Sequence, residues 1–180
     1  MVTFSKIKFD GVVVELTWTT TLDGGGEIVH TLKSTDAPKA DFAEALRAMV
    51  PHVLDVLELD GCGLEDAVAV TGLSINTEED GRRGLVCTCR RPLDIANAPF
   101  VFNTPHLREF VGDDTLKGFI PDKMFAAMEA VERAAGDYLK GKRGQGDLFE
   151  DLAPKADSGI SSVTISAGGK SVTLERKGKR

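Results

Sequence analysis

The sequence predicts an α+β fold, in which an antiparallel sheet packs against two main helices and a β-hairpin ends the chain. Short alternating segments joined by glycine-containing turns occupy residues 4–32, which is typical of an antiparallel meander. Two longer segments repeat apolar residues every three or four positions, the pattern of helices with one buried face. A last alternating pair surrounds Gly168-Gly169 and predicts the hairpin.

The expected strands follow the alternation of apolar and polar residues. They cover residues 4–9, 12–20, 27–32, 68–75 and 85–90. The polar stretch between the last two, Asn76 to Gly84, is long enough to predict a mobile loop. Residues 91–121 show no regular pattern and contain Pro92, Pro99 and Pro105, so we expect irregular structure there.

Both helices are predicted by one apolar face each. The first face is formed by Phe42, Leu46, Met49, Val53 and Val56. Pro51 lies inside this pattern, which predicts either a kink or two abutting helices. The second helix is expected to open at Pro121-Asp122 and to run to about Leu139, with Gly141 and Gly144 stopping it.

These elements divide the chain into three parts. Residues 1–140 form the α+β domain, residues 141–159 an exposed linker, and residues 160–180 a hairpin with a basic tail. A lone two-stranded hairpin is marginally stable in water. We therefore expect residues 160–180 to dock on the domain, to pair with another chain, or to order upon binding.

Composition and net charge exclude several classes of function. The 180 residues are 42% hydrophobic and 28% charged, which suits one globular core. The net charge of −6 argues against a protein that coats nucleic acid with its whole surface, and it is too small for a DNA mimic. The N-terminus lacks the apolar region of a signal peptide and no apolar run is long enough to span a membrane, so we expect a cytoplasmic protein.

The three cysteines favour a structural role. Cys62, Cys87 and Cys89 are an odd and sparse set, which suits a reducing compartment better than a disulfide scaffold. Cys87 and Cys89 alternate within a strand, so their sulfurs should share one face and pack in the core. The Cys-x-x-Cys spacing of zinc sites is missing. We expect no metal site and no cofactor.

The most specific motif is Gln145-Gly146-Asp147-Leu148-Phe149, called here the clamp-like peptide. Clients of the bacterial DNA polymerase III β sliding clamp dock through a short peptide of the pattern Gln, any residue, Ser or Asp, Leu, Phe. Leu148 and Phe149 would fill an apolar pocket as adjacent anchors. Gln145 can donate and accept hydrogen bonds at a neighbouring polar subsite. A chance match to Gln145, Asp147, Leu148 and Phe149 arises in roughly 1 in 300 chains of this length. The alternative is that Leu148 and Phe149 fold back onto the helix that ends near Leu139.

Residues up to Phe149 also resemble a group of small phage and prophage proteins of unassigned function. The resemblance is carried by residues 30–34 (HTLKS), 42–46 (FAEAL), 103–106 (NTPH) and 138–141 (YLKG), followed by the clamp-like peptide. Such proteins tend to be encoded near single-strand-binding and recombination functions and usually stop at the peptide. The resemblance implies a role in phage DNA replication or recombination within the bacterial host. This chain departs from the group by continuing into the hairpin.

A nucleic-acid site is the main alternative from another class. Arg82, Arg83, Arg90 and Arg91 bracket one expected strand and would form a basic patch along a sheet edge. Aromatic residues that stack on single-stranded bases are sparse, at 6% of the chain. The same arginines also suit an edge that discourages sheet-to-sheet pairing.

No enzyme is expected. Asp122 with Glu175-Arg176-Lys177 echoes the carboxylates and lysine of a metal-dependent nuclease, which stays a distant alternative. We therefore expect a non-enzymatic accessory protein that binds the host clamp through Gln145, Asp147, Leu148 and Phe149. The open alternatives are a clamp inhibitor and a DNA-binding or annealing module. The sequence leaves the role of residues 103–106 undefined.

Overall fold

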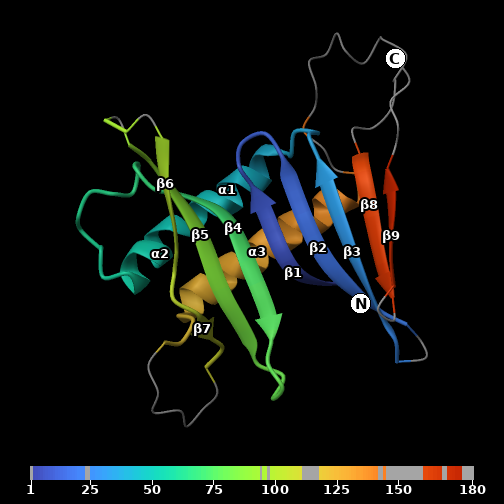
Figure 1. Ribbon diagram of the computed structural model, residues 1–180. Coiled ribbons are helices and arrows are strands. Elements are labelled where there is room, and N and C mark those ends of the chain that lie inside the picture. Colours follow the sequence, from blue (N-terminus) through green and yellow to red (C-terminus); the bar gives the residue numbers. More distant parts are fainter. Residues whose placement is uncertain are drawn as a thin grey trace, which may run out of the picture.

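The structure of the chain is a computed structural model (Figure 1). It describes residues 2–22, 25–93, 95–96, 98–110, 118–141 and 144, and the backbone of residues 160–167 and 170–175. One antiparallel sheet carries its helices on a single face. The α+β class predicted from the sequence is confirmed.

The sheet is built from nine strands within the described residues. They are β1 (Val2–Phe9), β2 (Val14–Thr21), β3 (Glu27–Ser34), β4 (Ala69–Thr77), β5 (Arg83–Leu93), β6 (Ala98–Asn103), β7 (Leu107–Arg108), β8 (Ile160–Ala167) and β9 (Lys170–Glu175). Their order is β6-β5-β4-β1-β2-β3-β8-β9, and β7 pairs with β5. The first three strands form the expected meander.

The helices α1 (Ala40–Ala48), α2 (Val50–Val56) and α3 (Asp122–Leu139) cover one face (Figure 1). Pro51 lies in the first turn of α2, where a proline removes no helical hydrogen bond, so the alternative of two abutting helices is confirmed. Gly141 follows α3 with a φ of 85°, a left-handed conformation that suits glycine and ends the helix. No helix in the described ranges is both long and apolar enough to cross a membrane.

The core lies between the helices and this face of the sheet. Phe42 of α1 is 1% exposed, and its ring stands edge-on to Phe9 of β1 at 5.9 Å and to Tyr138 of α3 at 6.1 Å. The Tyr138 hydroxyl also donates to the Asp36 carbonyl at 2.8 Å. One aromatic cluster therefore joins β1 of the sheet to both α1 and α3.

No helix from the described part of the chain covers the opposite face of the sheet (Figure 1). We call it the open face. Along β2, the buried Val14 and Leu16 alternate with Glu15 and Thr17, which lie on this side. One apolar and one solvated face are what an antiparallel sheet allows.

Two expectations about the connections are wrong. Residues 76–84 do not form a long loop, because β4 continues to Thr77 and β5 begins at Arg83. The turn between them is closed by the Glu78 N–H, which donates to the Arg82 carbonyl at 2.8 Å. The region after Arg91 is not wholly irregular either, since it completes β5 and holds β6 and β7.

The sequence did not predict β6 because its region contains several prolines, which are rare within strands. Pro99 of β6 lies opposite Pro92 of β5, near the end of their ladder. β6 is an edge strand, where a missing N–H costs no hydrogen bond on its outer side. At Pro92, β5 has already lost its other neighbour, because its pairing with β4 ends at Arg90.

The C-terminal hairpin joins the main sheet. β8 pairs with β3 over the register Val29↔Ser166 to Ser34↔Ile160, and β9 forms the other edge. Of the three alternatives left open, docking on the domain is the one that the backbone shows. The boundary expected between residues 1–140 and 160–180 does not separate two sheets.

Candidate functional site

The clamp-like peptide lies outside the described residues, and the nearest described residues are Gly144 before it and Ile160 after it. Before it, the Gly144 N–H donates to the Ala37 carbonyl at 2.7 Å. After it, Ile160 begins β8 opposite Ser34. Gly144 and Ile160, which flank residues 145–159, therefore both bond or pair with the same short stretch, residues 34–37, just before α1.

The first of these anchor points requires glycine. A Cβ atom on Gly144 would lie 2.8 Å from the Pro38 carbonyl oxygen and 3.2 Å from that of Ala37. Both neighbours are backbone atoms, which cannot rotate away as a side chain does. The absence of a side chain at Gly144 thus allows the close approach and its hydrogen bond.

The four candidate arginines are separated into two pairs. Arg82 and Arg83 lie at the start of β5 and are engaged in ion pairs. Arg82 bonds Asp80 at 2.6 Å, and Arg83 bonds Glu132 of α3 at 2.6 Å. The Arg83 guanidinium also lies over the Phe125 ring at 5.4 Å. Arg83 therefore fastens β5 to α3.

Arg90 and Arg91 lie at the other end of β5 and are exposed. At 3.3 Å per residue, about 23 Å of strand separates Arg90 from Arg83. Successive strand residues point to opposite faces, so Arg90 and Arg91 serve different sides of the sheet. The four arginines do not form one continuous patch.

An aromatic pair beside Arg91 was missed by the sequence reading. Phe100 and Phe102 of β6 stack with ring centroids 5.4 Å apart and an interplanar angle of 23°. Phe102 packs against the core, whereas Phe100 is 53% exposed. Arg91 lies directly opposite Phe100 in the β5–β6 ladder. The run Phe100-Val101-Phe102 was the signal in the sequence.

Residues 103–106 have a structural role that the sequence left undefined. Thr104 is buried, and it exchanges two hydrogen bonds with Cys87: its Oγ1 accepts from the Cys87 N–H at 2.9 Å, and its N–H donates to the Cys87 carbonyl at 3.0 Å. His106 Nε2 lies 3.0 Å from Asn76 Oδ1, and the two side chains meet above Gly84. This segment carries the chain along β5 from β6 to β7.

The cysteines of β5 are structural. Cys87 and Cys89 are 0% exposed and lie on the same buried face, as the sequence predicted. Burial raises the pKa of Cys87 to about 12 and that of Cys89 to about 11, so neither is a thiolate near neutral pH. Within the described residues there is no group of three or more His, Cys, Asp or Glu side chains that could hold a metal ion.

A cavity of about 540 Å³ is lined by the end of β1, by α1, by residues at the start of β4 and by the end of β5. Its wall includes apolar residues such as Leu46 and Val70, two arginines (Arg47 and Arg90), and acids that include Glu65. Charges of both signs therefore line it, and they select no particular class of ligand.

Comparisons of the chain with protein-family models, with curated proteins and with solved structures give no significant match.

Proposed function

We propose that the protein is a phage or prophage accessory protein of DNA replication or recombination that docks on the host β sliding clamp. The observation that carries this proposal is the clamp-like peptide, in which Gln145, Asp147, Leu148 and Phe149 match the client pattern. Leu148 and Phe149 supply the buried aliphatic and aromatic anchors that dominate small interfaces. Gln145 sets the register by hydrogen bonds.

The anchor points beside α1 support this proposal. Five residues of extended chain beyond Gly144 span at most about 17 Å. The covalent length thus allows Phe149 to reach well away from the domain. Binding to a separate pocket would break neither the Gly144 anchor nor the β3–β8 ladder.

The clamp-like peptide is tested with purified clamp. The double substitution Leu148→Ala/Phe149→Ala should weaken binding by at least about 30-fold, because interface hot spots are worth about 2 kcal/mol or more each. Binding is measured by surface plasmon resonance on immobilised clamp. Leu152→Ala, in the same linker (residues 141–159), is the matched control and should bind as the wild type does. Undiminished binding of the double variant would exclude the peptide as the docking element.

An accessory protein and a clamp inhibitor differ in their effect on synthesis. An inhibitor must outcompete the polymerase for the clamp and therefore stops clamp-dependent primer extension at saturating concentration. We propose an accessory protein, for which extension continues when the chain is bound. If saturating wild-type protein stopped primer extension completely and Leu148→Ala/Phe149→Ala did not, the protein would be a clamp inhibitor and not an accessory protein.

A second candidate function is the binding of single-stranded DNA at the β5–β6 edge. The observation that favours it is the exposed ring of Phe100, stacked on Phe102 and opposite Arg91. Aromatic rings stack on bases of any sequence, and arginine binds phosphate.

This second candidate predicts that Phe100→Ala weakens single-strand binding by about 5- to 150-fold, since one base–aromatic stack is worth about 1–3 kcal/mol. Fluorescence anisotropy of a labelled oligonucleotide at low salt measures it. Phe110→Ala is the matched control, because Phe110 is exposed to a similar degree, 52%, and lies outside the β5–β6 edge. If Phe100→Ala and Phe110→Ala bound the oligonucleotide with the same affinity, the β5–β6 edge would not be the site of single-strand binding.

A further inference from the structure

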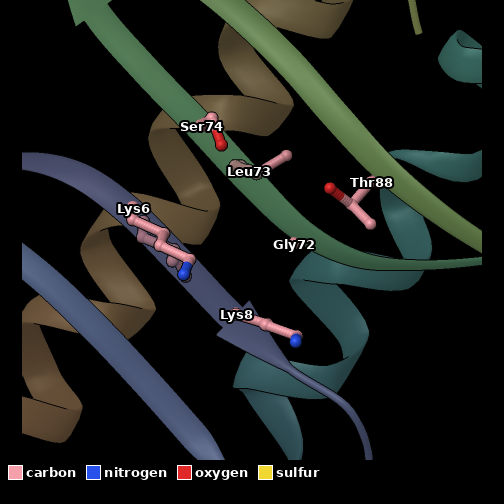
Figure 2. Close-up of a pocket in the computed structure, with 7 residues that line it drawn as sticks. Lys6, Lys8, Gly72, Leu73, Ser74 and Thr88 are labelled. Atoms are coloured by element: carbon pink, nitrogen blue, oxygen red, sulfur yellow. The ribbon is translucent and has the colours of Figure 1, made fainter. Parts of the chain in front are cut away.

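The centre of the open face holds a hollow of about 130 Å³ (Figure 2). Its floor is Gly72 of β4, and four polar side chains surround it: Lys6, Lys8, Ser74 and Thr88. In the ladders, Gly72 lies between Lys8 on one side and Thr88 on the other. Figure 2 shows Lys8 and Thr88 on either side of Gly72.

The hollow exists because position 72 lacks a side chain. A Cβ atom there would lie 3.1 Å from the Ile7 carbonyl oxygen, so a larger residue would press on the backbone of β1. A register shift between Val70 and Gly72 interrupts the β4–β5 ladder at the same place. Sheet geometry thus leaves a recess flanked by an ammonium group and a hydroxyl group.

Positive charge is concentrated around this recess although the whole chain carries −6. A transverse row across the sheet runs Gly72, Lys8, Glu15, Lys33, Ser162 and Glu175. Its second acid, Glu175, lies at the far edge of the sheet, on β9, five strands from Gly72. Lys6 bonds Glu15 at 2.7 Å, whereas Lys8 and Lys33 take part in no ion pair among the described residues. The hydrogen bond from Lys6 is the largest cause that lowers the pKa of Glu15, and the charges of Lys8 and Lys33 add to it.

We propose that the open face binds the phosphodiester backbone of double-stranded DNA, with one phosphate group seated in the Gly72 hollow. Lys8 and Lys33, which form no ion pair with a described side chain, supply positive charge, and Ser74 and Thr88 supply hydroxyl donors. This inference extends the proposed function, because a protein docked on a clamp lies next to the duplex that the clamp encircles.

The chemistry of this face favours a duplex over a single strand. No aromatic side chain belongs to the row or the hollow, so the platform that stacks single-stranded bases is missing there. Lysine and hydroxyl contacts to phosphate carry no sequence information, and a broad sheet meets the regular backbone of a duplex. Binding is therefore independent of sequence and strongly dependent on salt.

The test measures the affinity for a 20-base-pair duplex, a probe length of about two helical turns, by anisotropy between about 50 and 200 mM salt. Lys8→Gln/Lys33→Gln should lower the slope of log K against log salt by about 1.8, because each phosphate contact contributes about 0.9. Lys39→Gln/Lys123→Gln is the matched control. It removes two exposed lysines from the helical side and should leave the slope unchanged.

Five results would overturn the inference. Four of them are no duplex binding by the wild type at about 50 mM salt, an unchanged slope in the Lys8/Lys33 variant, an equal loss in the control, and a preference for single strands that Phe100→Ala removes. Displacement by millimolar inorganic phosphate at matched ionic strength would likewise assign the hollow to a small anion. All assays omit the clamp, so failure here is distinguishable from failure of the clamp-like peptide.

Discussion

Replacing Phe42 by alanine is expected to destabilise the fold by about 3–5 kcal/mol, the usual cost of truncating a buried phenylalanine. Phe42 is 1% exposed and contacts the rings of Phe9 and Tyr138, so its removal opens a cavity where α1, β1 and α3 meet. Domains of this size are stable by 5–15 kcal/mol, so the loss is a large fraction of the total. Urea unfolding at neutral pH measures it.

The matched control for this prediction is Phe100→Ala, the same substitution at a ring that is 53% exposed. It should change the free energy of unfolding by less than about 1 kcal/mol, because little area is buried there. If Phe42→Ala and Phe100→Ala destabilised the fold equally, the claim that the Phe42 ring lies at the centre of the core would be wrong. A stable Phe100→Ala protein also validates its use in the single-strand assay.

The second large effect is a loss of stability at alkaline pH that depends on the two buried thiols of β5. Burial is the first cause that raises the pKa of both groups above the ordinary value of 9.0, to about 12 for Cys87 and about 11 for Cys89. Below pH 9 both the folded and the unfolded chain hold these protons, and the stabilisation is fully present. Above pH 9 the unfolded chain releases them first, so stability is lost progressively up to about pH 12.

One pKa unit corresponds to about 1.4 kcal/mol, and pH 10.5 lies about 1.5 units above the unfolded pKa, so the two thiols together should lower the free energy of unfolding by about 4 kcal/mol between roughly pH 8 and 10.5. Urea unfolding without oxygen, at a series of pH values, measures this loss. Other groups also titrate in this range, and the double substitution Cys87→Ala/Cys89→Ala isolates the thiols. Its stability should be lower at neutral pH but should fall less steeply above pH 9. Cys62→Ala, at the exposed cysteine, should keep the wild-type slope. Parallel curves for the wild type and the double variant would refute the prediction.

Much of the fold follows from local patterns. The apolar spacing of α3, its opening at Pro121-Asp122 and its stop at Gly141 are written in consecutive residues. The same holds for the meander of β1 to β3 and for the break at Pro51. Such features depend on contacts within one or two turns of chain, which a single sequence records directly.

The candidate sites could be predicted less well from local sequence patterns. Arg83 reads as a free cation in the sequence, yet its partner Glu132 lies 49 positions away on α3. Phe100 and Phe102 stood in a region set aside because of its prolines, although an edge strand tolerates them. Lys8 and Thr88 come together only because β4 lies between β1 and β5. Charge pairing and recesses are properties of neighbours in space.

The sequence by itself determined the clamp-like peptide, the α+β class and most element boundaries, because each is encoded in a short contiguous stretch. The tertiary structure alone decided the strand order, which seats β4 beside β1 and β8 beside β3. That order places Ile160 opposite Ser34, near the Gly144 contact with Ala37, and brings Lys6 and Lys8 beside Gly72. Strand order is settled by which apolar faces share one core and which backbone edges pair, and both are long-range contacts that no local pattern contains.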